Sequence, residues 1–264
     1  MRTHYQPIRS GTQSVERAIT LLKLVAATNA TGSKFNELMQ QSQLNRTTLH
    51  RLLKCLIQQE AIRYDAIKKS YFLGQLIFQF GIVTKQQVDL HAMLSASLTR
   101  IAEDTGDTAF LLIRSENDAI YIDRRAGPYP IKTFVVEVGT RRPLGIGAGS
   151  LTMLSALSPQ DIKRVVQANE TALAAFGQTS KKLLAAVAIT QKKGYASIPV
   201  EGLSGVLALG LPVLDPQGTP IAAFSVAAIV ERMSPSRQQK IVQVLKREAI
   251  LLQGLLTDKN VLDH

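Results

Sequence analysis

The stretch Asn45-Arg46-Thr47-Thr48-Leu49-His50-Arg51-Leu52-Leu53-Lys54 carries two kinds of side chain that recur with the period of an α-helix. Its apolar positions lie at three- and four-residue spacing and continue past the stretch, as Leu49, Leu52, Leu53, Leu56 and Ile57. The opposite face is basic or polar, with Arg46, Thr47, His50, Arg51 and Lys54. Asparagine is a favoured helix N-cap, and Asn45 directly precedes the pattern. We predict an amphipathic helix from Arg46 to about Glu60.

Two more helices are predicted upstream. Apolar residues follow Ser14, an available N-cap, at helical spacing as far as Ala26, and a shorter helix fits Phe35 to Gln41. A tight turn around Gln43-Leu44-Asn45 joins the shorter helix to the one that begins at Arg46. A short helix, a turn and a longer helix with a basic first turn are typical of a helix-turn-helix, whose second helix enters the major groove of DNA.

A β-hairpin is predicted directly after these helices. Ala61–Tyr64 and Ser70–Leu73 have the composition of short strands, and the five residues between them end in Lys68 and Lys69. Lysines at a hairpin tip suit phosphate contacts, which add affinity and salt dependence without sequence choice. Residues 14–74 are therefore interpreted as a winged helix-turn-helix, preceded by a basic arm at residues 1–13.

The chemistry of the exposed side chains fits double-stranded DNA. Arginine can bridge guanine O6 and N7, threonine can contact a thymine methyl group, and hydroxyl groups can bind phosphate. The predicted DNA-binding residues are Asn45, Arg46, Thr47, Thr48, His50, Arg51, Lys68 and Lys69. Any exposed helix face carries charge, however, so a protein-docking adaptor without DNA binding stays open as an alternative. We expect Cys55, at the border of the apolar face, to pack rather than to do redox chemistry.

The distribution of charge favours the same end of the chain. The 264 residues include 31 Lys and Arg against 20 Asp and Glu, and residues 1–73 hold 11 basic and 4 acidic side chains. The single cysteine cannot form an intrachain disulfide, and no apolar run approaches the roughly 18 residues that span a bilayer. We expect a soluble, cytoplasmic protein without a membrane role, because its basic residues lie on a predicted globular module.

The remaining residues predict a sheet covered by helices. Helical patterns at 75–83 and from Asp89 to about Gly106 form a helical linker over residues 75–104. Strands are predicted at 108–113, 119–123, 131–138, 206–214 and 220–230, and helices at 148–157, 159–166, 181–193 and 235–256. Strands flanked by helices without a strict βαβ order indicate an antiparallel sheet with helices packed on it, hence an α+β fold.

Several separated motifs resemble the IclR family of bacterial regulators. They are Ser14-Val15-Glu16-Arg17-Ala18-Ile19, Thr47–Leu53, Tyr71-Phe72-Leu73-Gly74, Val138–Leu144, Gly194-Tyr195-Ala196, Gly205–Val213 and Ile221–Val226. The resemblance implies a winged helix-turn-helix joined to a GAF-like α/β effector-binding domain at residues 105–264. It also implies a transcriptional regulator that binds a palindromic operator as a homodimer or homotetramer and responds to a small molecule.

The resemblance further implies a pocket between the sheet and the segment that enters a helix after Pro143. Mapping the family's ligand-contacting regions gives Leu144, Ala148, Gly149, Ile198, Ala208, Ser225 and Ala227. Glycines let backbone approach a ligand closely, and the first N–H groups of a helix attract anions. Since Ser225 is the one polar side chain of the set, we expect a ligand with an apolar body and one carboxylate. The alternative that these residues fill a core stays open.

An enzymatic function finds little support in the residues. The run Gly145–Ser150 lacks the third glycine of a dinucleotide-binding loop, and no Gly-x-Ser-x-Gly elbow occurs. The histidines are scattered, without the spacing of metal ligands. We therefore expect no catalytic residues, no metal and no cofactor. A salt-insensitive interaction without retention on DNA would distinguish the docking adaptor from the regulator.

Overall fold

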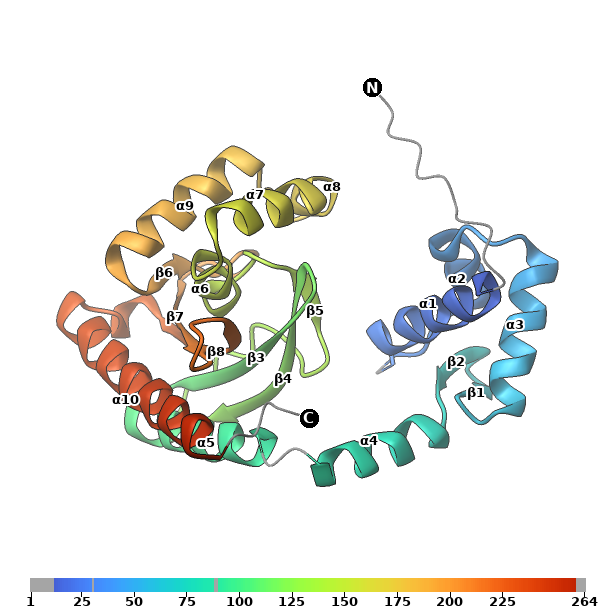
Figure 1. Ribbon diagram of the computed structural model, residues 1–264, viewed down its shortest axis with the longest axis horizontal. Helices are drawn as coiled ribbons and strands as arrows, with labels where there is room; N and C mark the ends of the chain where they lie inside the picture. The colour runs from blue at the N-terminus through green and yellow to red at the C-terminus, as the bar shows by residue number, and fades with distance from the viewer. Residues whose placement is uncertain (1–11, 30, 88–89, 260–264) are drawn as a thin grey trace. The chain divides into compact units, whose positions relative to one another are not determined.

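The computed structural model describes residues 12–29, 31–87 and 90–259 (Figure 1). The chain forms two compact units, residues 1–87 and 88–264, and each is considered by itself. The division falls inside the segment that the sequence assigns to the helical linker. Most of the basic arm and the expected cap Asp89 lie outside the described residues. Among the described helices, none is long and apolar enough to cross a membrane.

The first unit is a winged helix-turn-helix. Its elements in chain order are α1 (Gln13–Ala27), α2 (Phe35–Ser42), α3 (Arg46–Gln58), β1 (Ile62–Asp65), β2 (Ser70–Leu73) and α4 (Gln75–Gln87). β1 and β2 are antiparallel, with Arg63 opposite Phe72, and Ser33 extends the ladder by bridging Tyr71. Leu21, Leu38, Leu49, Leu53 and Ile62 form the buried centre of its core. The predicted amphipathic faces of the helices meet there.

The start of α1 differs from the prediction. The carbonyl oxygen of Thr12 accepts the N–H groups of Val15 and Glu16 at 2.9 and 3.0 Å, so Thr12 is the N-cap and Ser14 lies within the first turn. The proposed cap at Ser14 is therefore wrong. At the other end of the unit, α4 continues four residues past the predicted end at Val83.

The second unit is built on a six-stranded sheet in the order β5-β4-β3-β8-β7-β6, with every neighbouring pair antiparallel. Its strands are β3 (Thr108–Ser115), β4 (Asp118–Ala126), β5 (Arg141–Pro143), β6 (Ala196–Pro199), β7 (Val206–Leu214) and β8 (Pro220–Ile229). α5 (Leu90–Thr105) and α10 (Pro235–Lys259) pack on one face. α6 (Ala148–Ser155) lies on the other face, and α7 (Pro159–Ala168), α8 (Glu170–Ala174) and α9 (Ser180–Lys193) complete the hydrophobic cluster around it (Figure 1).

Alternation along the strands divides the core into two layers. In β3, Leu111 packs toward α5 and α10, whereas Phe110 and Leu112 pack toward α6. β8 behaves in the same way, with Phe224 on the first face and Ala223 on the second. Because successive side chains of a strand point to opposite faces, both faces of the sheet are apolar and both are covered.

The strand predicted at residues 131–138 is absent from this unit, and several short elements were not predicted. Residues 131–138 are not a strand, because Thr133 is held by side-chain contacts: its N–H donates to Thr108 Oγ1 at 3.2 Å and its hydroxyl to the Ala227 carbonyl at 2.6 Å. The short elements β5, β6 and α8 were not predicted, since three to five residues carry too little periodicity. Gly194 ends α9 in the left-handed region.

Gly210 lets α6 rest directly on the sheet. A Cβ atom at this position of β7 would lie 2.4 Å from the Ala148 carbonyl carbon and 2.6 Å from the Gly149 nitrogen. Contacts this short involve backbone on both sides, so a larger residue must displace the first turn of α6. The position of that turn is therefore set by the absence of a side chain at Gly210.

We expect Gly210→Ala to lower the free energy of unfolding by about 1–3 kcal/mol, because it overpacks a backbone contact. Gly254→Ala is the matched control, since a Cβ there has nothing within 4 Å and alanine is the better helix former in α10. Urea unfolding of both variants measures the difference. Equal stability of the two variants would show that α6 does not depend on Gly210.

Candidate DNA-binding surface and effector cavity

Helix α3 begins as its sequence predicts. The Asn45 side chain accepts the Thr48 N–H at 2.8 Å and caps the helix. Leu49, Leu53 and Leu56 are buried, which turns the other face of the helix outward. The exposed residues of that face are Arg46, Thr47, His50, Arg51 and Lys54, while Thr48 is half-buried. The first turn thus presents polar groups from a fixed backbone.

Phe35, at the start of α2, orients two of these side chains. The Arg46 guanidinium lies 5.5 Å from the centre of the Phe35 ring, and the His50 ring lies 6.5 Å from it. A cation over an aromatic ring is attracted by the negative face of the ring. Sequence reasoning did not assign Phe35 a role, although it is the first residue of the helix that the tight turn joins to α3.

The tip of the wing is closed by Asp65. Its Oδ1 accepts the N–H groups of Ile67 and Lys68 at 3.0 and 2.9 Å. The hydrogen bond from Lys68 lowers the pKa of Asp65, so the carboxylate that holds the tip stays ionised. Lys69 has a left-handed backbone with φ +49°, and Lys68 lies with its ammonium 5.7 Å from the Phe72 ring centre. Both predicted lysines are exposed at the tip.

Cys55 does not pack in the core. The side chain is exposed, because the buried row of α3 passes through Leu49, Leu53 and Leu56. The prediction that Cys55 packs is therefore wrong.

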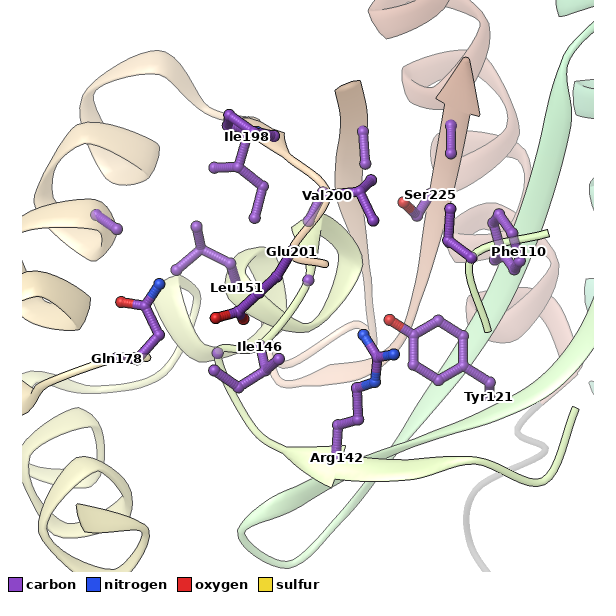
Figure 2. Close-up of a pocket in the computed structure, with 18 of the residues that line it drawn as sticks. Phe110, Tyr121, Arg142, Ile146, Leu151, Gln178, Ile198, Val200, Glu201 and Ser225 are labelled. Carbon is purple, nitrogen blue, oxygen red and sulfur yellow. The ribbon is translucent and has the colours of Figure 1, made fainter. Parts of the chain in front are cut away.

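The second unit contains a cavity of about 370 Å³ on the sheet face that meets α6 (Figure 2). Phe110, Ala208, Ser225 and Ala227 form its floor on β3, β7 and β8. The segment Gly145–Ala148 and Leu151 bring in the start of α6, and Leu183 and Ala186 come from α9. Ile198 to Glu201 contribute another wall. Cavities of this size hold small metabolites.

The strand register explains why the floor residues meet. Ile198 lies opposite Ala208, and Ala208 lies opposite Ala227, so these three form one row across β6, β7 and β8. In a neighbouring row, Ser225 lies between Gly210 and Phe110. Residues distant in the sequence therefore share one side of the sheet.

Five of the residues that the resemblance indicated line this cavity, namely Ala148, Ile198, Ala208, Ser225 and Ala227. Leu144 and Gly149 do not line it. Leu144 is fully buried in the core, and the Gly149 Cα faces the sheet, since a Cβ there would lie 2.7 Å from Leu112 Cδ1. Their expected place in the cavity wall is corrected accordingly.

Sequence reasoning missed the polar groups of the cavity, which are Tyr121, Arg142, Gln178 and Glu201. The register of β5 against β4 directs Arg142 to the cavity. Arg141 donates to Asp118 at 2.6 Å, whereas Arg142 lies opposite the buried Ala119, on the side of the sheet that bears the cavity. Tyr121 is two residues along β4 from Ala119 and shares its face. Figure 2 shows both side chains at one end of the cavity.

Burial shapes the acid–base behaviour of Tyr121. Its side chain is 5% exposed. Burial raises the pKa of the Tyr121 hydroxyl, and the positive charge of Arg142 offsets part of the rise. The phenol is therefore a hydrogen-bond donor at neutral pH. Among the residues that the structure describes, no three His, Cys, Asp or Glu side chains gather as metal ligands.

Curated relatives match the chain over most of their length. The transcriptional regulator XynR of Escherichia coli (strain K12) is 25% identical over 246 residues, which cover 92% of this chain and 97% of the relative. The transcriptional repressor IclR of the same organism is 26% identical over 239 residues, covering 88% and 85%. Both are regulators by name.

Solved structures share the fold. An IclR transcriptional regulator from Alicyclobacillus acidocaldarius superposes with a TM-score of 0.76 at 24% identity, over 92% of this chain and 98% of that one. An IclR homolog from Microbacterium hydrocarbonoxydans, crystallised with 4-hydroxybenzoate, superposes with a TM-score of 0.72 at 15% identity, over 93% and 100%.

Two family descriptions cover both units. Residues 14–66 match the IclR helix-turn-helix domain, and residues 83–251 match the C-terminal domain described as bacterial transcriptional regulator IclR. The second match alone covers more than half of the chain. Together with the helix-turn-helix at one end and the covered antiparallel sheet at the other, these matches show that the chain belongs to the IclR family of bacterial transcriptional regulators.

Proposed function

We propose that the chain binds a palindromic operator through α3 and the wing, and that a small molecule in the C-terminal cavity changes its affinity for DNA. The main observation in support of this proposal is that the basic first turn of α3 is exposed, while the apolar face of the helix packs into the core of the unit. In this arrangement Arg46, Thr47, His50 and Arg51 face base edges, and Lys68 and Lys69 contact phosphates. Asn45 and Thr48 fix the start of the helix at the backbone of the DNA.

The cavity supports the sensing half of the proposal. It has the volume of a small metabolite and an apolar floor, and a relative of the same fold was crystallised with 4-hydroxybenzoate. We infer that the effector is a small carboxylate with an apolar or aromatic body. It regulates by binding the DNA-competent and DNA-incompetent arrangements with different affinity. A non-enzymatic, cytoplasmic role agrees with relatives that are named as transcriptional regulators.

Arg51→Ala and Lys69→Ala separate base reading from phosphate binding. We expect Arg51→Ala to cost about 1–3 kcal/mol on the native operator and to relax its sequence preference, because a bidentate guanine contact is lost. Lys69→Ala is expected to weaken all DNA similarly and to reduce the salt slope by about one. Fluorescence anisotropy on operator and scrambled duplexes, at several salt concentrations, measures both effects. If both variants bind the operator like wild type, the proposed docking face is wrong.

Asp65→Ala tests whether the closed wing tip assists binding. The N–H groups of Ile67 and Lys68 lose their acceptor, so the tip becomes ordered only when DNA binds. Because this ordering costs entropy, we expect roughly 3- to 10-fold weaker binding to any duplex. Asp65→Asn is the matched control, because its amide oxygen can still accept both N–H groups. The same anisotropy assay compares them. Wild-type affinity in Asp65→Ala would exclude a binding role for an ordered tip.

A single recognition helix reads only a few base pairs, so a useful specificity ratio requires two of them. We therefore expect a dimer, or a dimer of dimers, on a site with two-fold symmetry whose half-sites lie one or more helical turns apart. Multi-angle light scattering with and without operator DNA measures the assembly. A monomer in both states is the result that contradicts this expectation.

A further inference from the structure

Arg142 is held at one end of the effector cavity by two aromatic rings. Its guanidinium carbon lies 6.0 Å from the centre of the Tyr121 ring and 5.7 Å from that of Phe176. The preceding Arg141 turns to the other side of β5 and donates to Asp118. The register therefore directs one arginine of the pair to a carboxylate of the protein and the other to the cavity.

The charge of Arg142 has no counterion within the described part of the chain. No carboxylate there lies within 4.0 Å of its guanidinium, whereas Arg124, Arg125 and Arg141 in the same region pair with Glu137, Asp123 and Asp118. Arg142 is half-buried. A cation removed from water costs free energy unless an anion compensates it. The missing anion is therefore expected to come from outside the chain.

Tyr121 supplies a second donor beside Arg142. Its hydroxyl makes no hydrogen bond to any described residue, although the side chain is 5% exposed and lines the cavity. Gly147, the N-cap of α6, leaves room for this hydroxyl, because a Cβ at Gly147 would lie 2.8 Å from the phenol oxygen. The phenol thus lies beside the start of α6. Figure 2 shows the hydroxyl and the guanidinium next to each other at this end of the cavity.

We propose that Arg142 and Tyr121 form the anion-binding end of the cavity and that the effector is a monocarboxylate whose aromatic or branched body lies on the sheet floor. This inference rests on the proposed effector-binding function. The guanidinium and the phenol donate to the carboxylate oxygens, and charge-assisted bonds of this kind are the strong ones. Phe110, Leu151, Ile198 and Ala208 receive the body. Glu201, which lines another wall, disfavours a second negative charge on the ligand.

The test uses the full chain and pairs of probes that differ only in charge. Titration calorimetry compares benzoate, 4-hydroxybenzoate, phenylacetate and 3-methylbutanoate with the primary amide of each acid. We expect at least one acid to bind more tightly than its amide. Arg142→Gln is expected to weaken that acid about 10- to 100-fold and to leave its amide unchanged, since it removes a charged hydrogen bond. Tyr121→Phe is expected to weaken it about 5-fold.

Arg141→Gln is the matched control, because it removes the same charge from the next residue but on the other side of β5. It should bind the acid like wild type, and circular dichroism melting verifies that all three variants fold. Acids that bind no better than their amides, or that lose as much affinity in Arg141→Gln as in Arg142→Gln, would overturn the anchor.

The same probes separate this inference from the proposed function when DNA affinity is measured in their presence. A neutral probe that binds and shifts DNA affinity, with no effect of Arg142→Gln, refutes the anchor and leaves the sensing function intact. An acid that depends on Arg142 but never shifts DNA affinity supports the anchor and refutes ligand-responsive regulation.

Discussion

The effector cavity depends on one contact, the approach of α6 to β7 at Gly210. The first turn of α6 lies against this glycine so closely that no Cβ fits between them. All residues of α6 are buried, so the helix has no solvent side into which it could shift. The contact also fixes Gly147, whose backbone at φ +92° leaves space for the Tyr121 hydroxyl. The absence of a side chain at Gly210 thereby sets where the first turn of α6 and the Tyr121 phenol lie at the cavity.

In the DNA-binding unit, aromatic rings limit the conformations of basic side chains. Long basic side chains are mobile, and holding them in place on binding costs side-chain entropy. Phe35 lies beneath Arg46, and Phe72 lies beneath both Arg63 and Lys68, at 4.3 and 5.7 Å from its ring centre. Part of the ordering is thus done before DNA arrives. In both units, charged side chains of the candidate sites lie against aromatic rings that limit their conformations.

Helices and strands could be predicted from the sequence where they are long enough to show a regular pattern of apolar residues. α3 combines a strong cap with a two-faced pattern, so its start and its exposed basic residues were predicted, whereas Cys55 at the border of the two faces was not. β7 and β8 are long enough for alternation to place Ala208 and Ser225 on one face. Residues 131–138 have the composition of a strand, but hydrogen bonds from Thr133 to β3 and β8 hold them in an irregular path. Arg142 was not predicted because β5 is only three residues long. The side of β5 that faces the cavity is set by its pairing with β4, which is distant in the sequence.

The apolar side chains and the polar donors of the cavity lie in different parts of it. The row Ile198, Ala208 and Ala227 is wholly apolar, which leaves Ser225 as the polar side chain of the floor. The donors Tyr121 and Arg142 come from β4 and β5. Apolar surroundings lower the local dielectric constant, and a charged contact gains strength when a ligand displaces water from them. A ligand whose body covers the floor would therefore strengthen its own charged contact with Arg142 and Tyr121 at the end of the cavity, and would be selected for shape and charge together.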